Sequence, residues 1–355
     1  MNIMNLFAAM PGALAQGLIW GIAAIGIYIT FRILDIADLT VDGSLCTGGA
    51  VCIMMMQAGC DVYLSIFVAT LVGMLTGLAT GIFHTLMGIP AILAGILTQL
   101  SLYSVNLKIM GKANQSINVD KYDLLVSLRY IKGVPFYQNT IFIVTLVILL
   151  VITVLYWYFG TESGSALRAT GCNGNMARAQ GINTDISKII GLMISNGLIG
   201  LSGALLAQYQ GFADINMGKG AIVIGLAAVI IGEAIFGRIF RNFYLKLLSV
   251  ALGSILYYLV LQVVIWMGID TDLLKLLSAL VVAVFLAIPY LKGKYFTSSK
   301  AILARVQALN ESVAAEGEGA AAGSVKTEGA NAADGSAKTE ATGAADSTNG
   351  KKEEA

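Results

Sequence analysis

The sequence is poor in charged residues: Asp, Glu, Lys and Arg make up 12% of the 355 residues. Soluble domains carry about 25%. Here hydrophobic residues reach 57%, the mean hydropathy is +0.79, and residues 62–107 contain no charged side chain apart from a single histidine. These shortages exclude an ordinary soluble domain and indicate a chain that lies largely in a lipid bilayer.

Residue types that bind metals or carry out catalysis are also scarce. The single histidine, His84, lies beside a predicted helix end without a cysteine or acidic neighbour, which favours an interfacial residue over a ligand or base. No C-x-x-C pair occurs, and we interpret the four cysteines as small apolar packing residues: Cys46, Cys52, Cys60 and Cys172. No G-x-x-x-x-G-K-S/T stretch is present, which excludes a P-loop ATPase. We expect no enzymatic activity, no catalytic residues, no bound metal or cofactor, and no nucleic acid partner.

Long apolar runs predict an all-α, polytopic membrane protein, because a bilayer core needs about 20 apolar helical residues per span. Eight or nine membrane elements are expected, near 11–31, 43–57, 62–83, 88–107, 139–160, 187–208, 219–236, 243–267 and 272–291. The second and seventh are short, which is typical of tilted, broken or re-entrant elements. Such breaks are tolerated only where protein or water satisfies the backbone.

The distribution of basic residues predicts which loops face the cytoplasm, since Lys and Arg favour the inner side in short loops. Placing 161–188 inside also places 237–246 and the C-terminus inside. The loop 108–138 opposes this assignment, because its five basic residues then fall outside. Nine crossings put the N-terminus outside, whereas a re-entrant second element would put it inside. We expect a multi-pass protein of the plasma membrane with a cytoplasmic C-terminus.

Residues 297–355 differ from the membrane domain, 1–296. Ala, Gly, Ser, Thr, Glu and Lys dominate, no aromatic residue follows Phe296, and a twelve-residue pattern starts at Lys326 and again at Lys338. Such a segment cannot bury enough apolar surface to offset its chain entropy. We predict a disordered cytoplasmic tail, either a passive solvated extension or a binding segment.

Two segments carry most of the polar residues of the membrane domain, Asp35–Val51 and Asp214–Ala234. Each runs from Asp through a Gly-containing turn into a short apolar helix, and in the proposed topology they enter from opposite sides. An inverted repeat around a translocation path would produce this pattern; the alternative is a pair of ordinary helix N-termini with Asp at the cap. For Asn196, a helix–helix hydrogen bond and a pathway role both stay open. The candidate pathway residues are Asp38, Asp42, Asn196, Gln208 and Asp214.

A polar, basic insert, Gly164–Asp185, separates two long apolar runs. It is long for a tether between spans, is rich in helix formers after Asn175, and carries Arg168 and Arg178. We interpret it as a docking surface for a second protein, with a short helix across about 173–180.

The insert resembles the cytoplasmic coupling segment of ABC-importer permeases. The matching residues are G-x-A-x-R-A from Gly164 to Ala169, followed by "NMARAQGIN" from Asn175. "GLSGALLAQYQG" from Gly200 and "MGKG…GLAAVIIG" from Met217 follow in the same order as in the branched-chain amino acid and ribose-type permease family. "DLTVDGSLCTGGAV" is similar to the early D-L-S/T-V-G-S segment of that family, with Asp42 as an extra residue. The resemblance covers about residues 12–292 and is nearest to the subgroup assigned to tryptophan and tyrosine uptake.

The resemblance implies a division of labour. Two copies of the permease would form the solute pathway, a separate ATPase that binds ATP and Mg would dock below, and an extracytoplasmic binding protein would deliver solute. Met176 and Ala177 would lie in a groove of the ATPase. The two arginines would pair with acidic groups of the ATPase or with lipid phosphate, or would only determine topology. The coupling residues carried over are Leu167, Arg168, Asn173, Met176, Ala177, Arg178 and Gly181.

Two other classes of function are considered. An ion-coupled secondary carrier would need ionisable residues deep within its spans, and these spans are nearly free of charge. A membrane scaffold would leave the basic insert unexplained. An aromatic amino acid is the favoured solute of the importer, with an aliphatic amino acid, a nucleoside or a sugar as alternatives.

Overall fold

The structure is a computed structural model in which residues 1–290 form one compact unit. It describes residues 3–119, 121–122, 124–131, 139–237, 239–240, 242–268, 276, 279–280, 282–284 and 287. Most of the ninth predicted element, 272–291, and the whole predicted tail, 297–355, lie outside the described residues.

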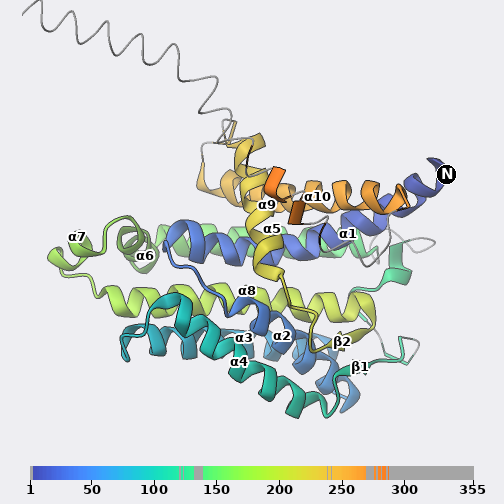
Figure 1. The fold of residues 1–355 in the computed structure, drawn as a ribbon, viewed down its shortest axis with the longest axis horizontal. Coiled ribbons are helices and arrows are strands. Elements are labelled where there is room, and N and C mark those ends of the chain that lie inside the picture. The colour runs from blue at the N-terminus through green and yellow to red at the C-terminus, as the bar shows by residue number, and fades with distance from the viewer. Residues whose placement is uncertain are drawn as a thin grey trace, which may run out of the picture. The chain divides into compact units, whose positions relative to one another are not determined.

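The described chain is almost entirely helical, which confirms the predicted all-α membrane fold (Figure 1). Within the described residues, six helices are long and apolar enough to cross a membrane. The helices are α1 (Ile3–Tyr28), continued by the π-helical turn η1 (Ile29–Ile33), α2 (Val41–Gln57), α3 (Val62–Thr85), α4 (Ala91–Met110), α5 (Thr140–Gly160), α6 (Glu162–Cys172), α7 (Gly174–Ala179), α8 (Thr184–Gln210), α9 (Ala221–Phe236) and α10 (Phe243–Trp266), with a 3-10 turn η2 (Leu128–Ile131).

Helix α8 lies at the centre of the bundle. It packs along α1 on one side and along α2 and α3 on the other, while α10 packs along α1 and α9 (Figure 1). Small residues permit these close approaches in lipid, where packing drives helix association. A Cβ at Gly77 of α3 would collide with the backbone of Leu192 in α8.

One short β-ribbon joins distant parts of the chain. Strand β1 (Asn114–Ser116) pairs antiparallel with β2 (Phe212–Asp214). The Gln57 amide at the end of α2 donates to the Ser116 carbonyl oxygen at 2.9 Å. Both strands have only three residues, too short for a sequence pattern to show. We call this part of the molecule the ribbon end.

The opposite end of the bundle is formed by η1, α6 and α7. The chain reverses after η1 at Asp35, whose φ of 55° lies in the left-handed region that Asp tolerates better than most residues. A Cβ at Gly171 of α6 would collide with the backbone of Ile33, so α6 lies directly on η1. We call α6 and α7 together the elbow, and this part of the molecule the elbow end.

Helices α2 and α9 each cover only part of the distance between the two ends. They have 17 and 16 residues, about 25 Å of helix against a bilayer core of about 30 Å. Residues 34–40 lead from the elbow end to the start of α2, and 215–220 lead from the ribbon end to the start of α9. Each helix then continues to the opposite end. The chain path from the elbow end through α2 to the ribbon end, where Gln57 bonds to Ser116, is the path that the nine-crossing alternative predicts.

The N-termini of α2 and α9 meet inside the bundle. The Asp42 carboxylate, in the first turn of α2, accepts hydrogen bonds from the backbone N–H groups of Gly220 at 3.0 Å and Ile222 at 3.2 Å. A Cβ at Gly218 would collide with the Asp42 carbonyl. Two half-length helices that meet N-terminus to N-terminus and run in opposite directions are what an inverted repeat predicts. The alternative interpretation, in which Asp caps a helix N-terminus, also fits Asp42. The helix that it caps is α9 and not its own helix α2.

Candidate coupling surface and solute pathway

The elbow is a rigid, capped connection between α5 and α8. Thr161 caps α6, Asn173 caps α7 and Asn183 caps α8. The Asn173 side-chain oxygen accepts from the Met176 N–H at 3.1 Å, as expected for a residue that satisfies the free donors of a helix start. Helix α7 confirms the predicted short helix across 173–180. Helix α6 is not expected from the sequence reasoning above, although Thr161 followed by Glu162 is a recognisable start signal.

The seven candidate coupling residues divide into exposed and buried groups. Met176 is 63% exposed, whereas Ala177 is only 3% exposed and Leu167 is fully buried. Leu167 and Leu34 both lie against Gly191 of α8. The expectation that Ala177 itself fits into a partner's groove is therefore wrong, because its methyl group is covered by its own chain. Met176 is the apolar side chain that faces outward, and Ala177 and Leu167 anchor the elbow beneath it.

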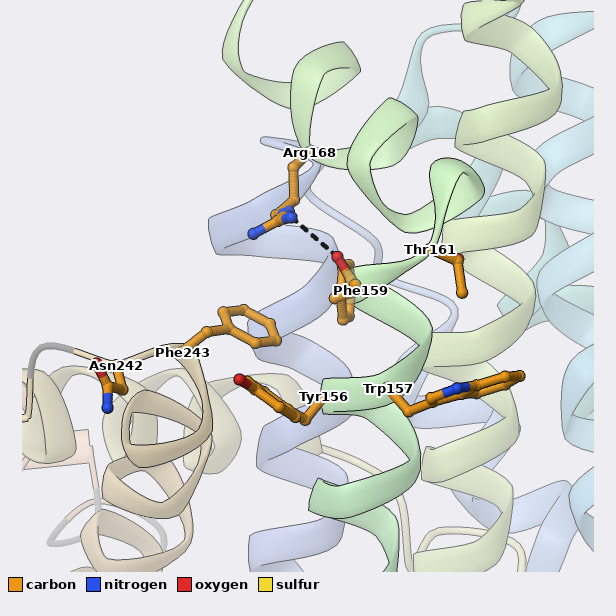
Figure 2. A pocket seen from close by; sticks show the side chains of 8 residues that line it. Tyr156, Trp157, Phe159, Thr161, Arg168, Asn242 and Phe243 are labelled. Atoms are coloured by element: carbon orange, nitrogen blue, oxygen red, sulfur yellow. Dashed lines mark hydrogen bonds between the residues drawn. The ribbon is translucent and has the colours of Figure 1, made fainter.

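Both candidate arginines are held by neighbours within the chain. Arg168 donates through Nη2 to the Phe159 carbonyl oxygen at 2.8 Å, and its guanidinium lies 5.9 Å from the centre of the Phe243 ring (Figure 2). Arg178 donates to the Thr184 hydroxyl at 2.7 Å and pairs with Asp185 at 3.4 Å. These contacts hold the elbow to α5, α8 and α10.

The turn from α7 to α8 depends on a glycine. Gly181 has a φ of +82°, a left-handed conformation that residues with a Cβ adopt only with strain. Its backbone N–H donates to the Arg178 carbonyl oxygen at 2.9 Å, and the Ile182 N–H donates to that of Ala177 at 3.1 Å. The sharp return of the chain into α8 is therefore built into the sequence at Gly181.

A cavity of about 610 Å³ opens beside the elbow, where α5 ends and α10 begins (Figure 2). Its aromatic side chains are typical of a membrane interface, where rings lie at the level of the lipid headgroups. The lining residues are Tyr156, Trp157, Phe159, Gly160, Thr161, Arg168, Asn242 and Phe243.

Two of the candidate pathway residues lie in one buried network. The Asn196 amide nitrogen donates to the Asp38 carboxylate at 2.7 Å, and the Ser44 hydroxyl donates to the Asn196 oxygen at 2.6 Å. Ser44 also bonds to the Thr76 hydroxyl at 2.7 Å, and Asp38 accepts from the Thr40 N–H at 2.9 Å. All five residues are buried. Asn196 therefore forms the helix–helix hydrogen bond that was one of its two open roles.

A second row of hydroxyl groups continues this network. The Thr40 hydroxyl bonds to that of Thr80 at 2.6 Å, and Thr80 donates to Thr98 at 2.9 Å. The sequence reasoning missed Thr76 and Thr80, although their spacing of four on α3 places them on one helix face. The network links α2, α3, α4 and α8 through buried polar groups.

The other three candidate pathway residues lie apart from this network. Gln208 is fully buried, and its side chain bonds to the Leu125 N–H at 3.3 Å and to Cys52 Sγ at 3.3 Å. Asp214 is in β2 and accepts from the Asn216 N–H at 2.7 Å. Asp42 lies where α2 meets α9. Asp38 and Asp214 each accept from the backbone two residues later, a local similarity between the two segments that the repeat hypothesis relates.

The residues present do not form a metal centre. Within the described ranges, no group of three or more His, Cys, Asp or Glu side chains could hold a metal ion. The His84 ring bonds to the Ile89 carbonyl oxygen at 2.9 Å and lies 3.5 Å from the Lys188 ammonium. It belongs to the helix end where α3 meets α8.

An apolar helical bundle with half-length helices meeting inside it, and an elbow between two spans, is the architecture of a multi-pass membrane protein. The sequence matches the family model described as branched-chain amino acid transport system / permease component over residues 10–289, and the chain belongs to that family. It is therefore a permease of the ABC import class and not a member of an enzyme class. Membership implies an ATPase and a solute-binding protein as partners.

Similar proteins come from several bacteria. The chain is 37% identical over 274 residues to the tyrosine transport system permease protein of Clostridioides difficile (strain R20291), covering 77% of this chain and 89% of that one. It is 35% identical over 279 residues to an uncharacterized protein of Rickettsia prowazekii (strain Madrid E), covering 78% and 95%. The autoinducer 2 import system permease protein LsrC of Yersinia pseudotuberculosis serotype O:3 (strain YPIII) is 29% identical over 182 residues, about half of each chain. No solved structure matches.

Proposed function

We propose that this permease carries an aromatic amino acid into the cell, driven by a separate ATPase that docks on the elbow. The structural observation that carries the docking proposal is the exposed Met176 on a short helix whose start is capped and whose underside is buried. The permease of Clostridioides difficile named for tyrosine transport supports the choice of solute. ATP and Mg would bind the partner, and this chain would bind neither.

A continuous set of contacts leads from the elbow into the bundle. Gly171 of α6 lies on Ile33 of η1, and the neighbouring Arg32 pairs with Glu233 of α9 at 3.0 Å. The first turn of α9 is held by Asp42 of α2. Closure of two ATPases would push on Met176, and this route would carry the displacement to the junction where α2 and α9 meet. A displacement must pass through packed elements of this kind to reach a distant site.

The remaining parts of the assembly are placed by the same proposal. The elbow end faces the cytoplasm, as does the C-terminus, and the ribbon end faces the solute-binding protein. Two copies of the chain form the pathway between them. Exposed apolar side chains along α3 and α4, among them Phe67, Leu71, Leu93 and Leu97, are available for lipid or for the second copy.

The docking proposal is tested by placing a charge on the elbow. Met176→Asp is expected to lower co-purification of the ATPase about tenfold, because a carboxylate in an apolar groove costs at least 1.4 kcal/mol, the equivalent of about one decade in affinity. Phe212→Asp makes the same kind of change at the ribbon end, where Phe212 is 37% exposed, and is expected to leave co-purification unchanged. Solute uptake that persists without any ATPase would contradict the proposal that an ATPase drives this permease.

A sugar-type solute is the second candidate, favoured by the similarity to the autoinducer 2 import permease. Uptake of tyrosine, tryptophan, leucine and ribose by the same reconstituted importer separates the two. Transport of ribose without transport of tyrosine would replace the amino acid proposal with the sugar one.

A further inference from the structure

A hollow of about 300 Å³ lies where the start of α2, one face of α4 and the 215–220 turn come together. It is separate from the buried network around Asn196 and from the cavity at the elbow. Its volume is at the lower end of the range of small-molecule sites, about 300–1,000 Å³. The lining residues are Asp42, Gly43, Cys46, Gln99, Leu100, Tyr103, Asn106, Ile215 and Lys219.

One buried amide oxygen in the hollow lacks a partner. Asn106 is 1% exposed, and its side-chain oxygen Oδ1 has no hydrogen-bond partner among the described residues. Its amide nitrogen makes a long contact of 3.5 Å with the Gly43 carbonyl oxygen, and its side chain also bonds to the Cys46 thiol. Burying an unpaired acceptor costs free energy. The side chains around this oxygen cover it in the structure, so a ligand in the hollow that displaces them and supplies a donor would recover that cost.

The hollow also carries both signs of charge. The Asp42 carboxylate is fixed by two backbone N–H groups of the α9 start, at 3.0 and 3.2 Å. Lys219, on the turn just before α9, makes no ion pair with another described residue. No ion pair joins Asp42 and Lys219, so each keeps capacity for a ligand. Zwitterions present these two charges a few ångströms apart.

The rest of the lining is apolar or aromatic apart from the Gln99 amide. Tyr103 is 47% exposed and Leu100 is 64% exposed, and Ile215 and Cys46 complete the wall. A ring gains from contact with such a surface, and an aromatic pair adds about 0.5–1.5 kcal/mol beyond the area that it buries.

We propose that the hollow is a binding site for a free aromatic amino acid on its way through the permease. The ammonium group would bind Asp42, the carboxylate would bind Lys219, the ring would lie against Tyr103 and Leu100, and a phenol O–H or indole N–H would donate to Asn106 Oδ1. This inference rests on the proposed function, and it adds a site within the permease itself to the specificity of any delivery protein.

The first test removes the unpaired amide. In the complete importer reconstituted in vesicles, Asn106→Leu is expected to lower tyrosine uptake about tenfold, the loss expected when one hydrogen bond to the solute is removed. Its thermal stability should be unchanged or raised, because the substitution deletes a buried polar group without a full set of partners. Ser101→Ala is the matched control on the same helix, since Ser101 bonds only to its own helix at Leu97.

The second test detects occupancy without relying on transport. In a chain with Cys60→Ser and Cys172→Ser, Gln99→Cys is labelled with a thiol reagent in the reconstituted importer, because Gln99 lines the hollow and has no assigned contact with the solute. Millimolar tyrosine should slow labelling about threefold or more, as expected when the ligand concentration is at least twice its Kd, and ribose should not.

The outcomes separate the site from the transport proposal. Tyrosine import with unchanged labelling and a fully active Asn106→Leu variant would overturn the site and leave the importer proposal intact. Protection by tyrosine without tyrosine import would support the site and contradict the proposed solute. If tyrosine is not imported and does not slow labelling, both the site and the proposed solute are overturned.

Discussion

At the scale of single residues, Asn196 has the most demanding environment in the described bundle. It is fully buried in α8, and it joins a carboxylate from the 34–40 segment to a hydroxyl of α2. A buried carboxylate is tolerated only when hydrogen bonds compensate for its lost solvation. Asn196 provides one of these bonds to Asp38, and Thr40 provides others through its backbone N–H and its side chain.

Replacing Asn196 is therefore expected to destabilise the fold. Asn196→Leu leaves one Asp38 oxygen without a donor and should lower the free energy of unfolding by about 3 kcal/mol. The change is measured as a lower midpoint of thermal unfolding in detergent. Asn175→Leu is the matched control, because Asn175 is exposed on α7 and surface changes stay within about 0.5 kcal/mol. Equal midpoints for the two variants would contradict the role assigned to Asn196.

At the scale of elements, helices α3 and α8 approach closely because glycines, which have no side chain, lie where the two helices cross. The backbone of Leu192 occupies the space where a Cβ of Gly77 would lie, and the same holds for Gly73 against the Asn196 carbonyl. Helices that approach so closely gain dispersion contacts that bulkier residues would prevent.

Adding one methyl group at this crossing should push the helices apart. Gly77→Ala is expected to lower the free energy of unfolding by about 1–3 kcal/mol, the usual cost of overpacking. Gly160→Ala is the control, because nothing lies within 4 Å of a Cβ built there. Reversible unfolding of both variants under the same detergent conditions measures the difference, and a Gly77→Ala variant as stable as the control would show that the crossing can relax.

At the scale of the whole molecule, the two ends of the bundle can be told apart by native cysteines. Cys60 follows α2 at the ribbon end and is partly exposed, whereas Cys172 closes α6 at the elbow end and is exposed. Cys46 and Cys52 are buried, and burial raises the barrier to reaction with any reagent.

An impermeant maleimide applied to intact cells should therefore label Cys60 and spare Cys172. Inside-out vesicles should show the reverse, because the proposed orientation places the elbow in the cytoplasm. Single variants, Cys60→Ser and Cys172→Ser, assign each signal to its residue. Labelling of Cys172 from the cell exterior would reverse the orientation and remove the basis for an ATPase on the elbow.

Much of the architecture follows from local sequence. Eight of the nine predicted membrane elements coincide with observed helices, because each span requires a long apolar run and each end is marked by Gly, Pro, Asn or charge. The short helix α7 is likewise predicted from Asn173 and the helix formers that follow it. Helix α6 was not predicted, because its mixed composition contains no long apolar run.

The sites depended on contacts that no local pattern contains. The sequence by itself determined a membrane bundle, its approximate spans and the basic insert, since hydropathy and capping act within about 20 residues. Only the tertiary structure placed Asp42 on the start of α9, 178 residues away, buried Ala177 beneath Met176, and placed Asn106 and Lys219 in the lining of one hollow. Each of these depends on how helices that are distant in the chain pack together, and packing in lipid is decided by shape complementarity between whole faces rather than by any single residue.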